Sequence, residues 1–120
     1  MPTILIVEDD YAVRQVIEAI IKSAHPDAVI VPVNHGSHAR DVMRTFRKKF
    51  DLALVDVVAR ADINSIQLLV KIKKEHPGTR VILMSGTEGP EGHNHYHAFL
   101  KKPFKMAKLL SLIDGLTGKP

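Results

Sequence analysis

The sequence predicts an α/β protein in which a doubly wound, five-stranded parallel sheet carries helices on both faces. Short apolar runs rich in β-branched residues alternate along the chain with amphipathic segments. In the first such segment, Val13, Val16, Ile17 and Ile20 recur at helical spacing. Strands that alternate with helices indicate right-handed crossovers, and these make the sheet parallel and cover both of its faces.

The strands are predicted from apolar runs bounded by proline, glycine or charged residues. They cover Thr3 to Val7, Ala28 to Val33, Asp51 to Val57, Arg80 to Met84 and Ala98 to Leu100. In the third run, Leu52 to Val55 are all apolar and lead directly to Asp56, which is typical of a strand buried on both faces. Pro32 cannot donate to a sheet ladder, so we expect the second strand at an edge of the sheet.

The helices are predicted from apolar residues that recur every three or four positions. They cover Asp10 to Ala24, His38 to Phe50, Ser65 to His76 and Lys105 to Leu116. Asp10 and Ser65 are expected to be N-caps. The expected inward residues of the last three helices are Ala39, Val42, Met43, Phe46, Ile66, Leu69, Val70, Met106, Leu109, Leu110, Ile113 and Leu116. Residues 87 to 97 lack apolar periodicity and are expected to form a loop with at most one short helix.

Length and composition limit the organisation and the class of protein. The 120 residues fit a single domain, from residue 1 to residue 120. The absence of cysteine excludes disulfides and thiol catalysis. No signal peptide or membrane-length apolar run is present, so we expect a cytoplasmic protein without a membrane partner.

The chain is basic, with a net charge of +4 and a pI of about 9.5. Much of this charge comes from two clusters, which contain Arg44, Arg47, Lys48 and Lys49, and then Lys71, Lys73 and Lys74. No aromatic residues interleave them and no DNA-binding motif is visible, so we interpret them as solvated helix faces without direct nucleic-acid contact.

Polar residues follow four of the predicted strands. In a doubly wound sheet these strand ends share one edge, where ligands bind. Crowded carboxylates attract a hard cation such as Mg²⁺, which also binds phosphate oxygens. An aspartate can attack phosphorus, and a hydroxyl and an ammonium can neutralise the phosphoryl oxygens. The residues concerned are Glu8, Asp9 and Asp10 after the first strand, Asp56 in the third, Ser85 after the fourth and Lys102 after the fifth.

These motifs, taken together, resemble the receiver domains of response regulators and hybrid histidine kinases over essentially the whole chain. The run from Ile4 to Asp10 is similar to the family's first strand and acidic pair, and Asn34-His35-Gly36 to its turn after strand two. The Lys102-Pro103-Phe104 run is similar to its Lys-Pro-Phe signature, where a cis peptide is usual. The resemblance implies a flavodoxin-like strand order, 2-1-3-4-5.

The resemblance also implies a function and a role for each matched residue. Asp56 would be the phosphoacceptor, with a histidine kinase or a phosphotransfer protein as the donor. Mg²⁺, or Mn²⁺, would be the cofactor. The chain would be a signalling switch rather than an enzyme, with an unidentified downstream protein target. The implied roles are metal binding for Glu8, Asp9, Asp56 and the Val57 carbonyl, phosphoryl contact for Ser85 and Lys102, and switching for Ser85 and Phe99.

Two departures from the family pattern leave an alternative open. The segment from Val58 to Ser65 lacks the family's Met-Pro and glycine, and the fourth helix of the family is predicted to be short or degenerate here. A receiver-like interaction module that is not phosphorylated is therefore the alternative function. A phosphatase with an aspartate nucleophile is disfavoured because its general acid, two residues later, is replaced by Val58.

Overall fold

A computed structural model of the chain describes residues 2–46, 49–57, 63–86 and 96–118, without the side chains of residues 37 and 63–66. Five strands and four helices lie in these ranges. In chain order they are β1 (Thr3–Val7), α1 (Tyr11–Ala24), β2 (Val29–Val33), α2 (Gly36–Thr45), β3 (Leu52–Asp56), α3 (Ile63–Glu75), β4 (Arg80–Ser85), β5 (Ala98–Lys101) and α4 (Met106–Thr117).

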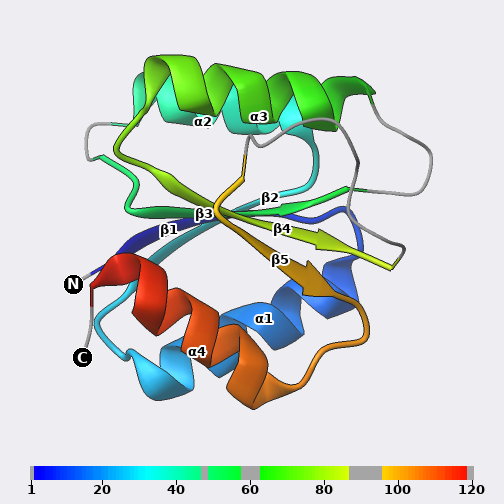
Figure 1. The fold of residues 1–120 in the computed structure, drawn as a ribbon, viewed down its shortest axis with the longest axis vertical. Helices are drawn as coiled ribbons and strands as arrows, with labels where there is room; N and C mark the ends of the chain where they lie inside the picture. The colour runs from blue at the N-terminus through cyan, green and yellow to red at the C-terminus, as the bar shows by residue number, and fades with distance from the viewer. Residues whose placement is uncertain (1, 47–48, 58–62, 87–95, 119–120) are drawn as a thin grey trace.

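The five strands form one parallel sheet in the order β2-β1-β3-β4-β5, as predicted. In Figure 1, α2 and α3 cover one face of this sheet, and α1 and α4 cover the other. The second strand is an edge strand, and Pro32 lies opposite Ile6 in its register. The edge position suits proline because its missing N–H removes no hydrogen bond from a central ladder.

The sheet separates two hydrophobic cores, because successive side chains of a strand point to opposite faces. In β1, Leu5 and Val7 pack under α2 and α3, whereas Ile4 and Ile6 pack against α1 and α4. The same alternation continues in β3 and β4. The near-continuous apolar strands in the sequence therefore supply both cores at once.

The second helix is shorter than predicted at its C-terminal end. It ends at Thr45, and Phe46 leaves the helix with an extended backbone. The rings of Phe46 and Phe50 stack with their centroids 4.8 Å apart, and Phe50 is buried in the core under α2 and α3. The helix therefore ends where the half-buried Phe46 stacks on the buried Phe50, which helical spacing alone does not show.

Three predictions about residues of the other helices are also wrong. Ser65 is not an N-cap, because α3 already begins at Ile63. Val70 is 42% exposed and Met106 is 56% exposed, although both were predicted to face inward. In α3 the buried stripe instead runs through Leu68, Leu69 and Ile72, so it passes beside Val70.

Two further predictions depend on which residues the structure describes. The short or degenerate fourth helix was predicted within residues 87–97, and residues 87–95 lie outside the described ranges. The helix labelled α4 is the one predicted from Lys105 to Leu116. Among the described residues, no helix has the length and apolar character needed to cross a membrane.

The register of α3 predicts opposite outcomes for two neighbouring substitutions. Leu69→Ala should lower the free energy of unfolding by about 2–5 kcal/mol, because it leaves a cavity in a closed core. Val70→Ala should change it by less than about 0.5 kcal/mol, because Val70 is at the surface. Urea denaturation of both variants measures this, and equal losses would contradict the observed register.

Candidate functional site

The acidic end of β1 is held by hydrogen bonds from three directions. The Glu8 N–H donates to the carbonyl of Val33 at 3.1 Å, which continues the pairing of β1 with β2. The Glu8 carbonyl accepts from Nη1 of Arg14 at 2.7 Å, and its carboxylate accepts from the N–H of Asp10 at 3.2 Å. Glu8 is 1% exposed, so its carboxylate is fixed inside the protein rather than solvated.

Asp9 and Asp10 have different structural roles. Asp10 is the N-cap of α1, as predicted, because its Oδ1 accepts from the N–H groups of Ala12 and Val13. Asp9 is exposed, yet it offers a carboxylate oxygen beside Glu8 and Asp56. The cap turns the chain into α1 and leaves Asp9 at the edge of the sheet.

Asp56 ends β3 at the same edge and is 8% exposed. The next residue, Val57, donates its N–H to the carbonyl of Met84 at 2.8 Å, which holds the strand end against β4. Carboxylate oxygens of Glu8, Asp9 and Asp56 lie within 4.8 Å of one another. The structure therefore brings together the three carboxylates that the sequence predicted.

The ammonium of Lys102 lies between two of these carboxylates. Its Nζ is 2.6 Å from Oε1 of Glu8 and 3.1 Å from Oδ1 of Asp56. The backbone is fixed as well, because the Lys102 N–H donates to the carbonyl of Ser85 at 2.7 Å and the Lys102–Pro103 peptide is cis. The Lys-Pro pair after β5 thus places the Lys102 ammonium beside the ends of β1 and β3.

Burial governs the charges in this cluster. It raises the pKa of Glu8 from 4.5 to about 7, and neighbouring Asp56 acts in the same direction, against the opposing hydrogen bonds from Lys102 and Asp10. Burial also penalises the ammonium of Lys102, but its contacts with Glu8 and Asp56 outweigh this and raise the pKa of Lys102. One ammonium among three carboxylates leaves the cluster short of positive charge.

These residues fit a hard divalent cation. Oxygen ligands close enough to share an ion are present on Glu8, Asp9 and Asp56, and two of the three side chains are buried. Mg²⁺ binds through one or two carboxylates and keeps several waters, which suits a site with an exposed side at Asp9. A divalent ion would also relieve the repulsion that contributes to the raised pKa of Glu8.

The two remaining predicted residues lie on the neighbouring strands. Ser85 ends β4 and is buried, one residue after the partner of Asp56 in the β3–β4 register. Phe99 lies in β5 and packs against the core under α2 and α3, where its ring is 6.4 Å from the ring of Tyr96. Ser85 thus lies at the acidic edge of the sheet, and Phe99 packs on the face of the sheet that α2 and α3 cover.

Sequence reasoning missed two features of the site. Arg14 was not singled out, although it fastens the Glu8 carbonyl from the first turn of α1. Its position six residues after Glu8 gave no signal until the N-cap fixed the start of the helix. The pairing of Lys102 with Glu8 was also missed, because it joins residues 94 positions apart.

The fold and the site together define a class of protein: a doubly wound parallel sheet with a lysine-bridged acidic cluster at the carboxyl edge of its strands. The family model described as the response regulator receiver domain matches residues 4–114. The chain therefore belongs to this family, whose members are signalling modules of two-component systems.

Relatives agree with this assignment. The DNA-binding transcriptional regulator NtrC of Rhizobium meliloti is 31% identical over 124 residues, covering 98% of this chain and 24% of that protein. The chain thus spans about a quarter of that relative's length. A response regulator from Thermotoga maritima has the same fold, with a TM-score of 0.81, 21% identity and 98% of each chain covered.

A further solved structure, that of the response regulator TrrA from Thermotoga maritima, also has this fold. Its structure in complex with Mg²⁺-BeF has a TM-score of 0.78 at 18% identity, and the match covers 97% of this chain and 99% of that one. The structure of the histidine kinase ThkA in complex with TrrA has a TM-score of 0.76 at 18% identity, with 97% and 98% covered.

The raised pKa of Glu8 predicts how stability depends on pH. Without metal, the folded state holds a proton on Glu8 up to about pH 7, whereas the unfolded state releases it near its ordinary value of 4.5. The free energy of unfolding should therefore fall as the pH rises through this window. We expect the free energy of unfolding of wild type, relative to that of Glu8→Gln, to decrease from pH 5 to pH 7.5. Urea denaturation of both proteins in a chelating buffer measures this. A difference that is constant with pH would contradict the raised pKa.

Proposed function

We propose that this chain is a phosphorylation-dependent signalling switch in which Asp56 accepts a phosphoryl group from a histidine kinase or a phosphotransfer protein. One observation carries the proposal: the carboxylates of Glu8, Asp9 and Asp56 converge on one edge of the sheet, with the Lys102 ammonium against two of them. Membership of the receiver family supports the same chemistry.

The proposed transfer moves one phosphoryl group between two proteins. A carboxylate oxygen of Asp56 attacks the phosphorus of a phosphohistidine, a P–O bond forms, and the P–N bond breaks and returns its electron pair to the donor imidazole. Asp56 suits this role because it is buried except for a small exposed fraction at the end of β3. The product is an aspartyl phosphate on this chain. The chain is itself modified and turns over no other substrate.

Neighbouring groups would stabilise the charge on the phosphoryl oxygens. Glu8, Asp9, Asp56 and the carbonyl of Val57 would hold Mg²⁺ or Mn²⁺, which supplies positive charge beside those oxygens when bound. Lys102 already contacts Asp56 at 3.1 Å, and phosphorylation would let it exchange this contact for a phosphoryl oxygen. The Ser85 hydroxyl, at the end of the adjacent strand, would donate a hydrogen bond to another oxygen.

Switching would follow from the movement of Ser85 toward the new group. Ser85 and Phe99 belong to adjacent strands that pair in register, so a shift at the end of β4 is passed to β5. Phe99 packs under α2 and α3 beside Tyr96, and a change in its packing would alter the surface there. A downstream protein that reads this surface is part of the proposal.

The donor is proposed from chemistry and from relatives. A solved neighbour with this fold is TrrA in complex with the histidine kinase ThkA, which supports a kinase as the partner of this chain. The NtrC relative is a DNA-binding regulator, but this chain covers 24% of its length. The proposal for this chain therefore ends at protein partners and includes no contact with nucleic acid.

The first test is intact mass spectrometry after incubation with Mg²⁺ and acetyl phosphate. We expect a single added phosphoryl group on the parent protein and none on Asp56→Asn, because the amide cannot act as the nucleophile. Asp27→Asn, which changes an exposed aspartate outside the acidic cluster, is the control and should keep the adduct. If neither acetyl phosphate nor a partner kinase labels the parent protein, the proposed switch is wrong and the interaction module becomes the better reading.

The two adjacent aspartates allow a matched test of the metal site. Asp9→Asn should weaken Mg²⁺ binding by roughly tenfold or more, because it removes a carboxylate from the cluster. Asp10→Asn should leave Mg²⁺ affinity and stability nearly unchanged, because asparagine caps a helix about as well as aspartate. Isothermal titration calorimetry with MgCl₂ measures both, and equal affinities for the two variants would remove Asp9 from the proposed ligand set.

A further inference from the structure

The layer of helices formed by α2 and α3 carries a groove that the phosphoacceptor site does not use. Its larger hollow has a volume of about 320 Å³ and lies between the two helices. A second hollow of about 300 Å³ adjoins it, and both are lined by Arg40 and Lys71. We call the two hollows together the α2–α3 groove.

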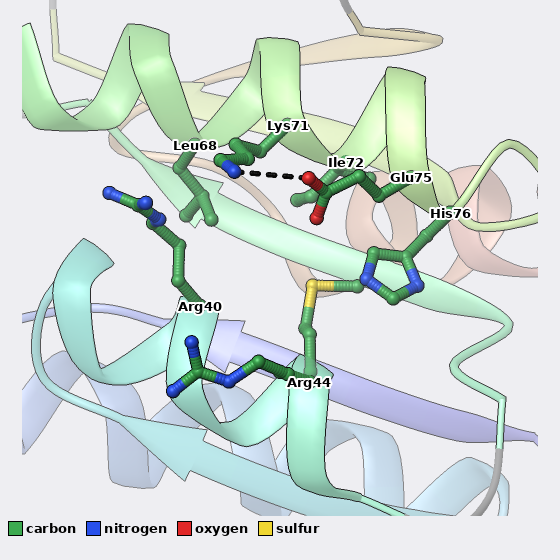
Figure 2. A pocket seen from close by; sticks show the side chains of 8 residues that line it. Arg40, Arg44, Leu68, Lys71, Ile72, Glu75 and His76 are labelled. Atoms are coloured by element: carbon green, nitrogen blue, oxygen red, sulfur yellow. Dashed lines mark hydrogen bonds and ion pairs between the residues drawn. The ribbon is translucent and has the colours of Figure 1, made fainter.

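The rim of the α2–α3 groove is basic. Figure 2 shows Arg40 and Arg44 rising from α2 on one side, with Lys71 on α3 across from them. Within the part of the chain that the structure describes, Arg40 has no acidic partner. Arg44 pairs with Asp41 at 3.0 Å, but this pair is highly exposed and contributes little stability. Two guanidinium groups one helical turn apart therefore remain available for carboxylates.

The floor of the α2–α3 groove is apolar. Met43, Leu68 and Ile72 line its base, and they are 7%, 1% and 1% exposed. Val70, which is unexpectedly exposed, lines the second hollow and adds apolar surface there. The alkyl stems of the surrounding arginine and lysine side chains extend this surface. The groove thus combines an apolar base with positively charged edges.

Two basic clusters that are far apart in the sequence meet here. Arg44 comes from the first cluster and Lys71 from the second, and both line the larger hollow. Lys73 and Lys74 are exposed and line neither described hollow. Arg44 and Lys71 remain exposed, as the interpretation of solvated helix faces expects, and in addition they line a shared hollow.

We propose that the α2–α3 groove binds an acidic, amphipathic segment of a partner protein, with its carboxylates on Arg40, Arg44 and Lys71 and its apolar side chains over the floor. Two adjoining hollows suit successive anchors of one segment better than a single compact molecule. The proposal goes beyond the phosphoacceptor role and does not require Asp56 to be phosphorylated.

The lining of the groove favours a protein segment over nucleic acid. Glu75 also lines the larger hollow, where its carboxylate pairs with Lys71 at 3.0 Å, and it acts against phosphates and partner carboxylates alike, so it does not decide between the two. Among the described residues that line the groove, there is no phenylalanine, tyrosine or tryptophan on which a base could stack. A carboxylate on the partner can instead share Lys71 or contact the arginines directly.

The probe for this proposal is a fluorescein-labelled helical peptide with leucines at positions i, i+3, i+4 and i+7 and glutamates on both flanks. Fluorescence anisotropy should give saturable, one-to-one binding to the full chain that weakens as salt rises. The doubly substituted Arg40→Glu, Arg44→Glu protein should bind about tenfold or more weakly. The matched Lys73→Glu, Lys74→Glu protein, with the same change in charge, should bind within about twofold of the parent.

Four outcomes would overturn the proposal. Equal losses in the two charge-reversed proteins would show attraction to overall charge alone. Equal binding by a scrambled peptide of the same composition would show that the apolar floor is unused. Absence of saturable binding, or displacement of the peptide by lower concentrations of duplex DNA than of unlabelled peptide, would also exclude the proposed occupant. Thermal denaturation of each variant verifies that it is folded, and the Asp56 phosphorylation assay reports on the other site separately.

Discussion

A parallel sheet must be covered on both faces, and this constraint organises the rest of the molecule. Because the strands are parallel, each connection returns the chain from the carboxyl end of one strand to the amino end of the next. The carboxyl ends of all five strands therefore lie along one side of the sheet. Glu8, Asp56, Ser85 and Lys102 are separated widely along the chain, yet each lies at or just after a strand end. Their meeting therefore needs no special loop, because the topology itself brings them together.

The charges at this edge are balanced incompletely, because one ammonium lies among three carboxylates. A buried carboxylate and a buried ammonium usually neutralise each other, but here Lys102 is divided between Glu8 and Asp56. A small change in charge at Asp56 therefore alters the environment of Glu8 as well. The Lys102 backbone is tied to Ser85, so the same change is also mechanically linked to β4.

Local patterns in the sequence predicted the strands and helices, the edge position of Pro32 and the cap at Asp10, and the structure confirms the last two. The strand order was implied by the resemblance to the receiver family, and the structure confirms it. The predicted strand ends placed the candidate residues on one side of the sheet, and the structure brings Glu8, Asp9, Asp56 and Lys102 together there. The errors arose where tertiary packing decides. The pairing of Phe46 with Phe50 ends α2 early, and the buried stripe of α3 passes beside Val70.

Contacts between distant residues could not be predicted in the same way. Helical spacing shows which side chains share a face, but it does not show which cation crosses the sheet edge to a given carboxylate. The contact between Lys102 and Glu8, and the meeting of Arg44 with Lys71, depend on the relative placement of whole elements. The side chains themselves carry no local mark of these partnerships.

The two cores on opposite sides of the sheet have a consequence for how this protein can vary. Residues of β1, β3 and β4 alternate between the cores, and the sheet backbone keeps the side chains of one core from touching those of the other. Substitutions in different cores should therefore combine nearly additively. A lineage can then remodel the layer of α2 and α3 to suit a new partner while the layer of α1 and α4 is inherited unchanged, so one scaffold can acquire different partners over evolutionary time.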